Sequence, residues 1–319
     1  MSSLPFPTPW FPKRILVSHA LHEGLGDYLL ERREDLEIRA RGLSEISAQD
    51  IAWAEVLVGF RAPREGAWQK LRWIHCIGAG VDAFAFRTGL SPDTLLTRTA
   101  EDFGPMMGEY CLARALAVTQ RLRQLDAEQR ARLWQPKHPK PLRGTRALIV
   151  GTGAVGRGIA HALQGAGCTV EGGSRSGAAR QPFTRVHPVA EFAAAVRGAR
   201  WLVLACPLTE DSFHLLDRSR LASCDGAYLI NVGRGQLVEE SALPDALERG
   251  CLSGAALDVF EVEPLPATSP LWALPEITLS PHISGLTTIP GAGDGFLACL
   301  AEVEAGRRPA LAVDVRRGY

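Results

Sequence analysis

Four charged or titratable side chains follow predicted strands in the second half of the sequence. Arg234 follows "AYLINVG", Asp258 lies at the end of "LSGAALDV", Glu263 comes five residues later, and His282 follows "EITLSP". An imidazole beside a carboxylate can carry a proton, and a guanidinium can bind a carboxylate or polarise a carbonyl. The residue types therefore favour acid–base chemistry on a small polar substrate.

Each of these residues also has an ordinary structural explanation. Arg234 could form a salt bridge, Glu263 could be a solvated loop carboxylate, and His282 could be a loop ring held by a local hydrogen bond. In an open parallel sheet, however, ligands bind at the carboxyl ends of the strands. We expect the four side chains to share that edge, which favours a common site over four separate accidents.

A glycine-rich turn stands before this set in the chain. Gly151, Gly153 and Gly156 form G-x-G-x-x-G directly after the apolar run "ALIV" and before a helical pattern. The first glycine permits the tight turn, the second lets backbone amides approach a pyrophosphate, and the third lets helix and strand pack closely. The helix N-terminus adds partial positive charge. The strand–turn–helix context favours dinucleotide binding over a turn that binds nothing.

The end of the next predicted strand bears on the choice of cofactor. An Asp or Glu about 20 residues after the glycine motif would bind the ribose 2′-hydroxyl of NAD. This stretch instead reads "GGSRSG", with Ser174, Arg175 and Ser176. A guanidinium and two hydroxyls suit a 2′-phosphate. We therefore expect NADP(H) to be preferred, with NAD(H) as the alternative, although Arg175 could also be a solvated surface residue.

The elements that must position these residues alternate between strand and helix. Short apolar runs separated by helical patterns predict parallel βαβ units in two series. The first series has strands at 14–19, 55–60, 72–80 and 94–99, and the second has strands near 146–150, 169–177, 201–207, 227–233, 252–259 and 276–282. Between the series, the pattern predicts one long helix from about Met106 to Leu133 and then an exposed connector, "QPKHPKPLRG".

Composition excludes several other classes of protein. The 319 residues are 46% hydrophobic and 22% charged, and 35 basic residues balance 35 acidic ones. A neutral chain of this kind offers no general attraction to nucleic acid or an anionic membrane, and no run reaches the ~18 apolar residues of a membrane span. The start lacks the apolar core of a secretory signal. Seven scattered cysteines without a C-x-x-C pair, and eight histidines without ligand spacing, predict a cytoplasmic protein without a metal site.

Three stretches, of which the second is long and highly specific, carry a resemblance to a known family. "GTGAVG", "NVGRGQLVEESALPDALERGCLSGAALDVFEVEPLP" and "SPHIS" are similar to the D-isomer-specific 2-hydroxyacid dehydrogenases, over nearly the whole chain. "RTAEDFGPMMGEYCLARAL", "QRARLW", the "SRS" stretch and the ending "VDVRRGY" resemble the glyoxylate/hydroxypyruvate reductase branch. Formate dehydrogenases, which are related, pair the histidine with glutamine, whereas position 263 is Glu.

The resemblance implies roles for individual residues. His282 would protonate the substrate carbonyl as hydride arrives, Glu263 would orient its ring, and Arg234 would bind the 2-oxo acid. The substrate carboxylate would lie on the backbone of "CIGAGVD", at Gly78, Ala79 and Gly80. The residues implied in cofactor binding are Met107, Gly151, Gly153, Ala154, Val155, Gly156, Ser174, Arg175, Ser176, Cys206, Pro207, Val232, Gly233, Arg234, Asp258, His282, Ser284 and Gly285.

One further substrate residue comes from position alone. "LVGFRAP" ends a strand of the first series with Phe60 and Arg61. By the strand-end argument, Arg61 would be a second cation near the substrate, favouring small polar 2-oxo acids. The alternative is a surface arginine before a proline turn.

The resemblance also implies an architecture. Residues 1–99 and 286–319 would form a discontinuous substrate domain and residues 100–285 an NADP-binding Rossmann domain, with parallel sheets in both and the active site in the cleft between them. The helix from Met106 to Leu133 would form a homodimer contact. The glycine-rich segment after His282 predicts that the following helix begins late.

The implied activity is reduction of glyoxylate and hydroxypyruvate to glycolate and D-glycerate. Two alternatives stay open. One is a reductase of bulkier 2-oxo acids such as phenylpyruvate. The other is a dinucleotide-sensing protein of the same fold without catalytic activity, because fold alone does not decide function. The preferred 2-oxo acid and the physiological direction do not follow from the sequence.

Overall fold

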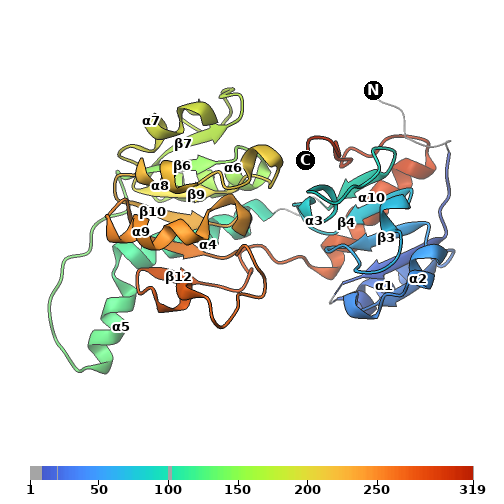
Figure 1. The fold of residues 1–319 in the computed structure, drawn as a ribbon, viewed down its shortest axis with the longest axis horizontal. Coiled ribbons are helices and arrows are strands. Elements are labelled where there is room, and N and C mark those ends of the chain that lie inside the picture. Colours follow the sequence, from blue (N-terminus) through green and yellow to red (C-terminus); the bar gives the residue numbers. More distant parts are fainter. Residues whose placement is uncertain (1–8, 20, 100–102, 319) are drawn as a thin grey trace. The chain divides into compact units, whose positions relative to one another are not determined.

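The computed structural model describes residues 9–19, 21–99 and 103–318. The chain forms two compact units (Figure 1): unit 1 comprises Met1–Glu101 with Leu286–Tyr319, and unit 2 comprises Asp102–Gly285. The first predicted domain crossing, after residue 99, adjoins residues 100–102, which lie outside the described residues. Each unit has its own parallel sheet.

Unit 1 is built on a five-stranded sheet. Its strands lie in the order β2-β1-β3-β4-β5, and every neighbouring pair is parallel. The central strands are buried on both faces, as their continuous apolar sequences require. The bounds are β1 Arg14–Ser18, β2 Glu37–Arg41, β3 Val56–Gly59, β4 Trp73–Cys76 and β5 Leu95–Arg98.

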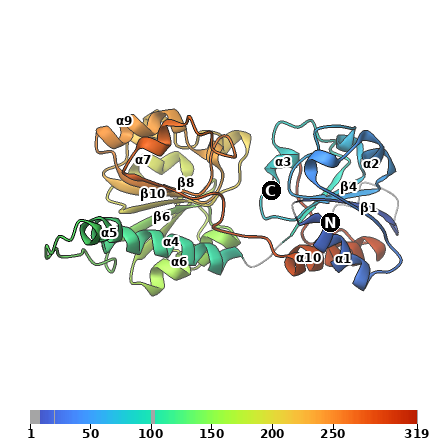
Figure 2. The same ribbon diagram turned by 90° about the horizontal axis from the view of Figure 1, so that it is seen from below.

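Helices cover both faces of this sheet (Figure 2). On one face lie α1 (His22–Arg32) and α10 (Ile289–Glu304), and on the other lie α2 (Ala48–Trp53) and α3 (Asp82–Ala85). The prediction that the glycine-rich segment delays the last helix was wrong, since α10 begins at Ile289 and contains Gly291, Gly293 and Gly295 in its first turns. Its glycines serve packing: a Cβ on Gly293 would lie 2.4 Å from the Tyr28 ring of α1.

Unit 2 contains a seven-stranded sheet. Its strands lie in the order β12-β11-β10-β9-β6-β7-β8, again with parallel neighbours throughout. The order changes direction between β6 and β9, where an open α/β sheet binds its ligand. The bounds are β6 Arg146–Val150, β7 Thr169–Ser174, β8 Val186–Pro188, β9 Trp201–Leu204, β10 Ala227–Asn231, β11 Leu252–Leu257 and β12 Ile277–Leu279.

The helices of unit 2 also form two layers. Figure 2 shows α4 and α6 on one face of the sheet and α7 and α9 on the other. α4 and α6 approach closely because small residues face each other: a Cβ on Gly158 would lie 2.3 Å from the backbone of Gly104. The predicted α/β fold with two parallel sheets is confirmed. The helices are α4 Phe103–Thr119, α5 Leu122–Arg130, α6 Ala154–Gly165, α7 Phe192–Val196, α8 Arg218–Ala222 and α9 Leu243–Glu248.

The prediction of one helix from Met106 to Leu133 was wrong. α4 ends at Thr119 and α5 begins at Leu122, because Arg121 adopts φ 58°, in the left-handed region that a continuous helix excludes. Non-glycine residues seldom adopt this conformation, and the sequence around Arg121 has no glycine or proline that would indicate a helix end.

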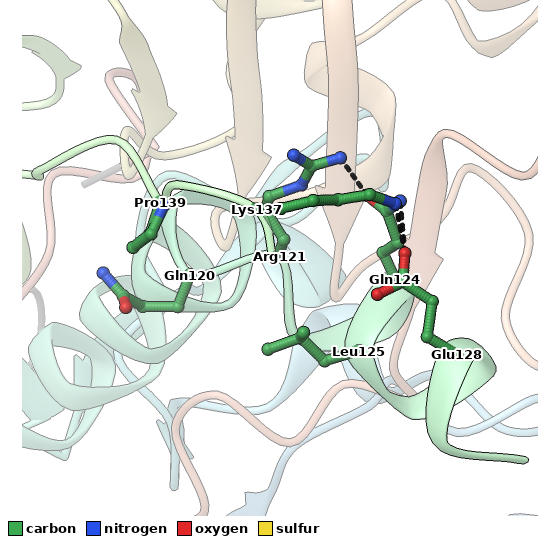
Figure 3. Close-up of a pocket in the computed structure, with 7 residues that line it drawn as sticks. All are labelled: Gln120, Arg121, Gln124, Leu125, Glu128, Lys137 and Pro139. Atoms are coloured by element: carbon green, nitrogen blue, oxygen red, sulfur yellow. Dashed lines mark hydrogen bonds and ion pairs between the residues drawn. The ribbon is translucent and has the colours of Figure 1, made fainter. Parts of the chain in front are cut away.

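A small hollow lies at this helix break (Figure 3). Its polar side chains bind one another: Arg121 donates to Gln124, and Gln124 and Lys137 both donate to Glu128. Lys137 comes from the connector after α5, so these contacts brace the projecting helix. The hollow lies away from the residues predicted to carry chemistry, and its internal pairing indicates a structural role.

Two strands were missed in the sequence. β2 has a half-exposed, alternating sequence, "EIRAR", and β8 has three residues. Both lie at the edge of their sheet, with a neighbouring strand on one side only. Part of each strand therefore faces solvent, and a continuous apolar run is not needed. Among the described residues, no helix combines the length and the apolar character that crossing a bilayer requires.

Candidate active site

The structure pairs His282 with Glu263 in unit 2. The Nδ1 atom of His282 lies 2.9 Å from Glu263 Oε2, and the side chains are 28% and 20% exposed. The backbone N–H of Phe260 donates to the other oxygen, Glu263 Oε1, at 3.1 Å. A half-buried carboxylate held by a backbone donor can orient the imidazole and fix its tautomer.

Asp258 anchors the turn that carries His282. Its side chain is fully buried and accepts three hydrogen bonds, from Ser280 Oγ (2.6 Å), Ile283 N (3.0 Å) and Ser284 N (2.8 Å). Its carbonyl accepts the His282 N–H at 2.8 Å. His282 itself has φ 54°, a left-handed conformation that costs a non-glycine residue about 1 kcal/mol. Asp258 supplies the hydrogen bonds that hold this conformation.

The anchor extends to helix α4. Tyr110 Oη lies 2.6 Å from Ser280 Oγ, which lies 2.6 Å from Asp258 Oδ1. Because the single Ser280 hydroxyl proton is used toward the carboxylate, Tyr110 donates to Ser280. Burial raises the pKa of Tyr110 further from neutrality, so the phenol remains a donor at physiological pH. The sequence interpretation did not include Tyr110 or Ser280.

Arg234 follows the neighbouring strand, β10. Asn231, the last residue of β10, donates from Nδ2 to the Arg234 carbonyl at 2.9 Å and accepts the Gly233 N–H at 3.2 Å. The guanidinium donates to the Gly233 carbonyl at 2.8 Å. β10, β11 and β12 are parallel neighbours, so Arg234, Asp258 and His282 all lie at one edge of the sheet.

The glycine turn lies at the same edge, after β6. Gly151 has φ 112°, and a Cβ there would lie 2.5 Å from the Ala205 backbone. A Cβ on Gly156 would lie 1.8 Å from the Gly151 carbonyl oxygen, which requires glycine for close packing. Nothing lies within 4 Å of a Cβ at Gly153, the N-cap of α6. Two glycines are thus needed for packing, while the third leaves its backbone open to a ligand.

Ser174 closes the turn after β7, where the cofactor preference was predicted. Its Oγ accepts the Gly177 N–H at 3.0 Å, while Arg175 and Ser176 are exposed. The sequence interpretation omitted Arg180, whose guanidinium donates to the Thr152 carbonyl of the glycine turn at 3.3 Å. A second arginine is therefore available beside the expected phosphate position. The missed signal was the basic residue five positions after Arg175.

The remaining predicted cofactor residues border this edge. Val232 and Gly233 follow β10, and a Cβ on Gly233 would lie 3.1 Å from the Cys206 carbonyl after β9, next to Pro207. A Cβ on Gly285 would lie 3.2 Å from the Met107 sulfur of α4. Ala154 and Val155 form the first turn of α6, and Ser284 lies in the Asp258-anchored turn.

Unit 1 presents the predicted substrate residues at its own carboxyl edge. Gly78 packs on the Phe60 ring so closely that a Cβ would lie 2.4 Å away, and the Ala79 carbonyl accepts from Arg98 at 2.8 Å. The Gly80 carbonyl accepts from the Cys76 thiol at 3.3 Å. Gly78, Ala79 and Gly80 are thus held in a defined loop after β4.

Arg61 lies after β3 at this edge, near a histidine that the sequence interpretation missed. Burial, and then the charge of Arg61, lower the pKa of His19. The His19 ring meets the Phe60 ring edge-on at 6.2 Å between centroids. His19 is therefore a neutral ring beside the Arg61 cation.

Comparison with known proteins identifies the family. Residues 112–284 match the family model described as D-isomer specific 2-hydroxyacid dehydrogenase, NAD binding domain. The chain belongs to this family. Residues 112–284 of this dehydrogenase are thus a domain that binds a nicotinamide dinucleotide, and its glycine turn fits such a cofactor.

Individual relatives of this dehydrogenase span most of its length. Glyoxylate/hydroxypyruvate reductase A from Yersinia enterocolitica is 34% identical over 258 residues, covering 78% of this chain and 82% of the relative. Among solved structures, a D-isomer specific 2-hydroxyacid dehydrogenase family protein from Aeromonas salmonicida is 32% identical with a TM-score of 0.84, covering 95% and 99% of the two chains. A homologue from Xanthobacter autotrophicus Py2, solved with NADPH and MES, is 29% identical with a TM-score of 0.84, covering 97% and 100%.

Proposed function

We propose that this dehydrogenase uses NADPH to reduce small 2-oxo acids, glyoxylate and hydroxypyruvate, to glycolate and D-glycerate. The observation that carries the proposal is the 2.9 Å contact of His282 Nδ1 with Glu263, at the sheet edge that also holds the glycine turn and Arg234. The Yersinia relative named glyoxylate/hydroxypyruvate reductase A supports the substrate class.

The chemistry follows from how these side chains are held. When bound, the nicotinamide supplies a hydride to the carbonyl carbon. Arg234 binds the 2-oxo acid and stabilises the negative charge that develops on the carbonyl oxygen. Glu263 engages Nδ1 of His282, so we assign Nε2 to the substrate oxygen, to which it gives its proton. Glu263 holds the ring in this orientation during the transfer.

The preference for NADPH rests on the segment after β7. Arg175 and Ser176 are exposed there without an acidic residue at the strand end, and Arg180 reaches the glycine turn. The Xanthobacter homologue was solved with NADPH. Because a charge-assisted contact contributes about 1.5–3 kcal/mol, Arg175→Ala should weaken NADPH binding at least tenfold and leave NADH binding nearly unchanged.

Unit 1 is proposed to hold the rest of the substrate. The loop of Gly78, Ala79 and Gly80 would bind the carboxylate through its backbone, and Arg61 would favour a polar or acidic group at the next carbon. Arg61→Ala should then raise KM for hydroxypyruvate about tenfold, with less effect on pyruvate. Equal losses on all substrates would remove Arg61 from substrate selection.

We further propose that the protein is a cytoplasmic homodimer. All seven cysteines are free thiols. Apolar side chains on and after α4 and α5 are exposed in the chain by itself: Leu116 (38%), Leu122 (47%), Leu125 (47%), Leu133 (52%) and Trp134 (95%). An apolar surface of this extent is typical of an interface. Light scattering after gel filtration should give twice the mass of the chain.

A substrate panel with both cofactors tests the proposed function. We expect NADPH oxidation with glyoxylate and hydroxypyruvate at higher kcat/KM than with phenylpyruvate. A preference for phenylpyruvate would favour a reductase of bulkier acids. NADPH binding without turnover on any 2-oxo acid would favour a dinucleotide sensor and refute the proposal.

A further inference from the structure

The loop that carries Arg234 presses directly on the turn that carries Glu263. A Cβ on Gly235 would lie 1.8 Å from the carbonyl carbon of Phe260, so the two backbones are in contact. The side chain of Gln236 donates to the Glu261 carbonyl at 3.0 Å. The substrate arginine and the histidine's partner are therefore built on segments that cannot move independently.

A pair of reciprocal hydrogen bonds fastens these segments. The Glu261 N–H donates to Glu240 Oε1 at 2.7 Å, and the Glu240 N–H donates to Glu261 Oε1 at 3.3 Å. Glu261 Oε1 also contacts His214 Nε2 at 3.1 Å. Two residues after Glu261, Glu263 meets His282. Glu240 thus holds, through its hydrogen bond with Glu261, the backbone that places Glu263.

The arrangement is electrostatically unfavourable. Burial raises the pKa of Glu240, and the charges of Glu261 and Glu263 raise it further, while the hydrogen bond from Glu261 opposes them. The hydrogen bond from the Glu261 N–H to Glu240 Oε1 nevertheless forms at 2.7 Å, so the position of this oxygen, more than its charge, fixes the turn.

We propose that Glu240 is a positioning residue, whose hydrogen bond with the 260–263 turn sets the contact of Glu263 with His282. This inference rests on the proposed function. The charged groups that act on it are Glu261 and Glu263. Beyond them, His214 contacts Glu261, His282 contacts Glu263, and Asp258 holds the turn of His282. Loss of the fastening would let Glu263 withdraw from the ring, and the protonated form of His282 would lose its partner.

The neighbouring carboxylate provides a matched control. Glu239 lies one residue away but accepts the Arg218 N–H at the start of α8, at 2.9 Å. In Glu240→Ala, kcat for reduction should fall about tenfold with KM nearly unchanged, and the alkaline limb of the pH profile should move to lower pH. Glu240→Gln keeps an oxygen for the Glu261 N–H and should retain most of the turnover. Glu239→Ala should change neither kcat nor the alkaline limb of the pH profile.

A second measurement is independent of turnover. The ring signals of His282, assigned by comparison with His282→Gln, should titrate with a lower midpoint in Glu240→Ala than in the parent protein. If no 2-oxo acid is reduced, the proposed function fails, while the midpoint still tests the role of Glu240. If Glu240→Ala does not fold, Glu240→Asp retains the charge without the reach and should give the same shift. An unchanged midpoint and pH profile with only a lower Tm, or an equal shift in Glu239→Ala, would overturn the proposal.

Discussion

Two histidines, one in each unit, have opposite surroundings. His75 lies inside β4 of unit 1 with no exposed surface, and its ring nitrogens face two hydroxyls, Thr97 Oγ1 at 2.8 Å and Thr99 Oγ1 at 3.1 Å. His282 follows β12 of unit 2, is partly exposed, and faces the carboxylate of Glu263 at 2.9 Å.

The difference shows how surroundings decide what a histidine does. Burial lowers the pKa of His75 to about 3, because neutral hydroxyls do not compensate for taking a charged ring out of water. A carboxylate favours the charged ring, and partial exposure gives protons and substrate access. His75 is a neutral hydrogen-bonding element of the core, while His282 has the surroundings of a proton donor.

Removing each ring should separate the two roles most strongly. His282→Ala should lose at least ~100-fold in kcat while NADPH still binds, because a general acid contributes 10²–10⁴-fold. His75→Gln should lower Tm but keep most of the turnover of the folded enzyme. Steady-state kinetics and NADPH fluorescence titration measure both effects. Near-normal turnover in His282→Ala would reduce that histidine to a structural ring as well.

The second prediction concerns acid stability. Below pH 6.5 the unfolded chain binds a proton at His75 that the folded chain refuses until about pH 3, so this group's contribution to stability is complete above pH 6.5 and falls as pH falls toward 3. Lowering the pH from 7 to 5 should therefore reduce the free energy of unfolding by about 2 kcal/mol through His75.

Urea unfolding, followed by tryptophan fluorescence at both pH values, measures this loss. His75→Gln should show a smaller decrease between pH 7 and 5 than the parent protein. His161→Gln, at an exposed position in α6, is the control and should keep the full decrease. Identical pH dependence in parent and His75→Gln would show that His75 does not resist protonation.

The third prediction tests the carboxylate partner. Glu263→Gln keeps an oxygen near His282 Nδ1 but removes the charge that favours the protonated ring. Reduction should lose about tenfold in kcat/KM at pH 8 and much less at pH 6, where the ring is protonated more readily. A pH series of kcat/KM gives the comparison. An equal loss at both pH values would indicate that Glu263 only positions the ring.

The smallest effect is expected at Tyr110. Tyr110→Phe removes the donor to Ser280 and loosens the Asp258 anchor of the His282 turn, so kcat should fall about threefold, in keeping with ~0.6 kcal/mol. Tyr228→Phe removes a hydroxyl from another buried tyrosine of unit 2 and should leave kcat unchanged. If both variants behave alike, the chain from α4 does not act on the His282 turn.

Sequence reasoning succeeded where the signal was local. The glycine motif, the continuous apolar strands and the strand-end positions of Arg234 and His282 depend on neighbouring residues, whose pattern reflects burial on both faces of a parallel sheet. It failed at Arg121, whose left-handed conformation ends α4 without a glycine or proline, and at the edge strands β2 and β8, which lack a continuous apolar run.

By itself the sequence determined the class of fold, the dinucleotide motif and the residue types available for proton transfer. The pairing of Glu263 with His282 was implied by resemblance, and the tertiary structure gave its geometry. Only the tertiary structure showed that Asp258 anchors the histidine's turn, that Glu240 binds Glu261 and that Arg180 reaches the glycine turn. These contacts join residues that are 19 to 28 positions apart in the chain. Such contacts depend on how strands order themselves in the sheet, and the local pattern of apolar and polar residues does not encode that order.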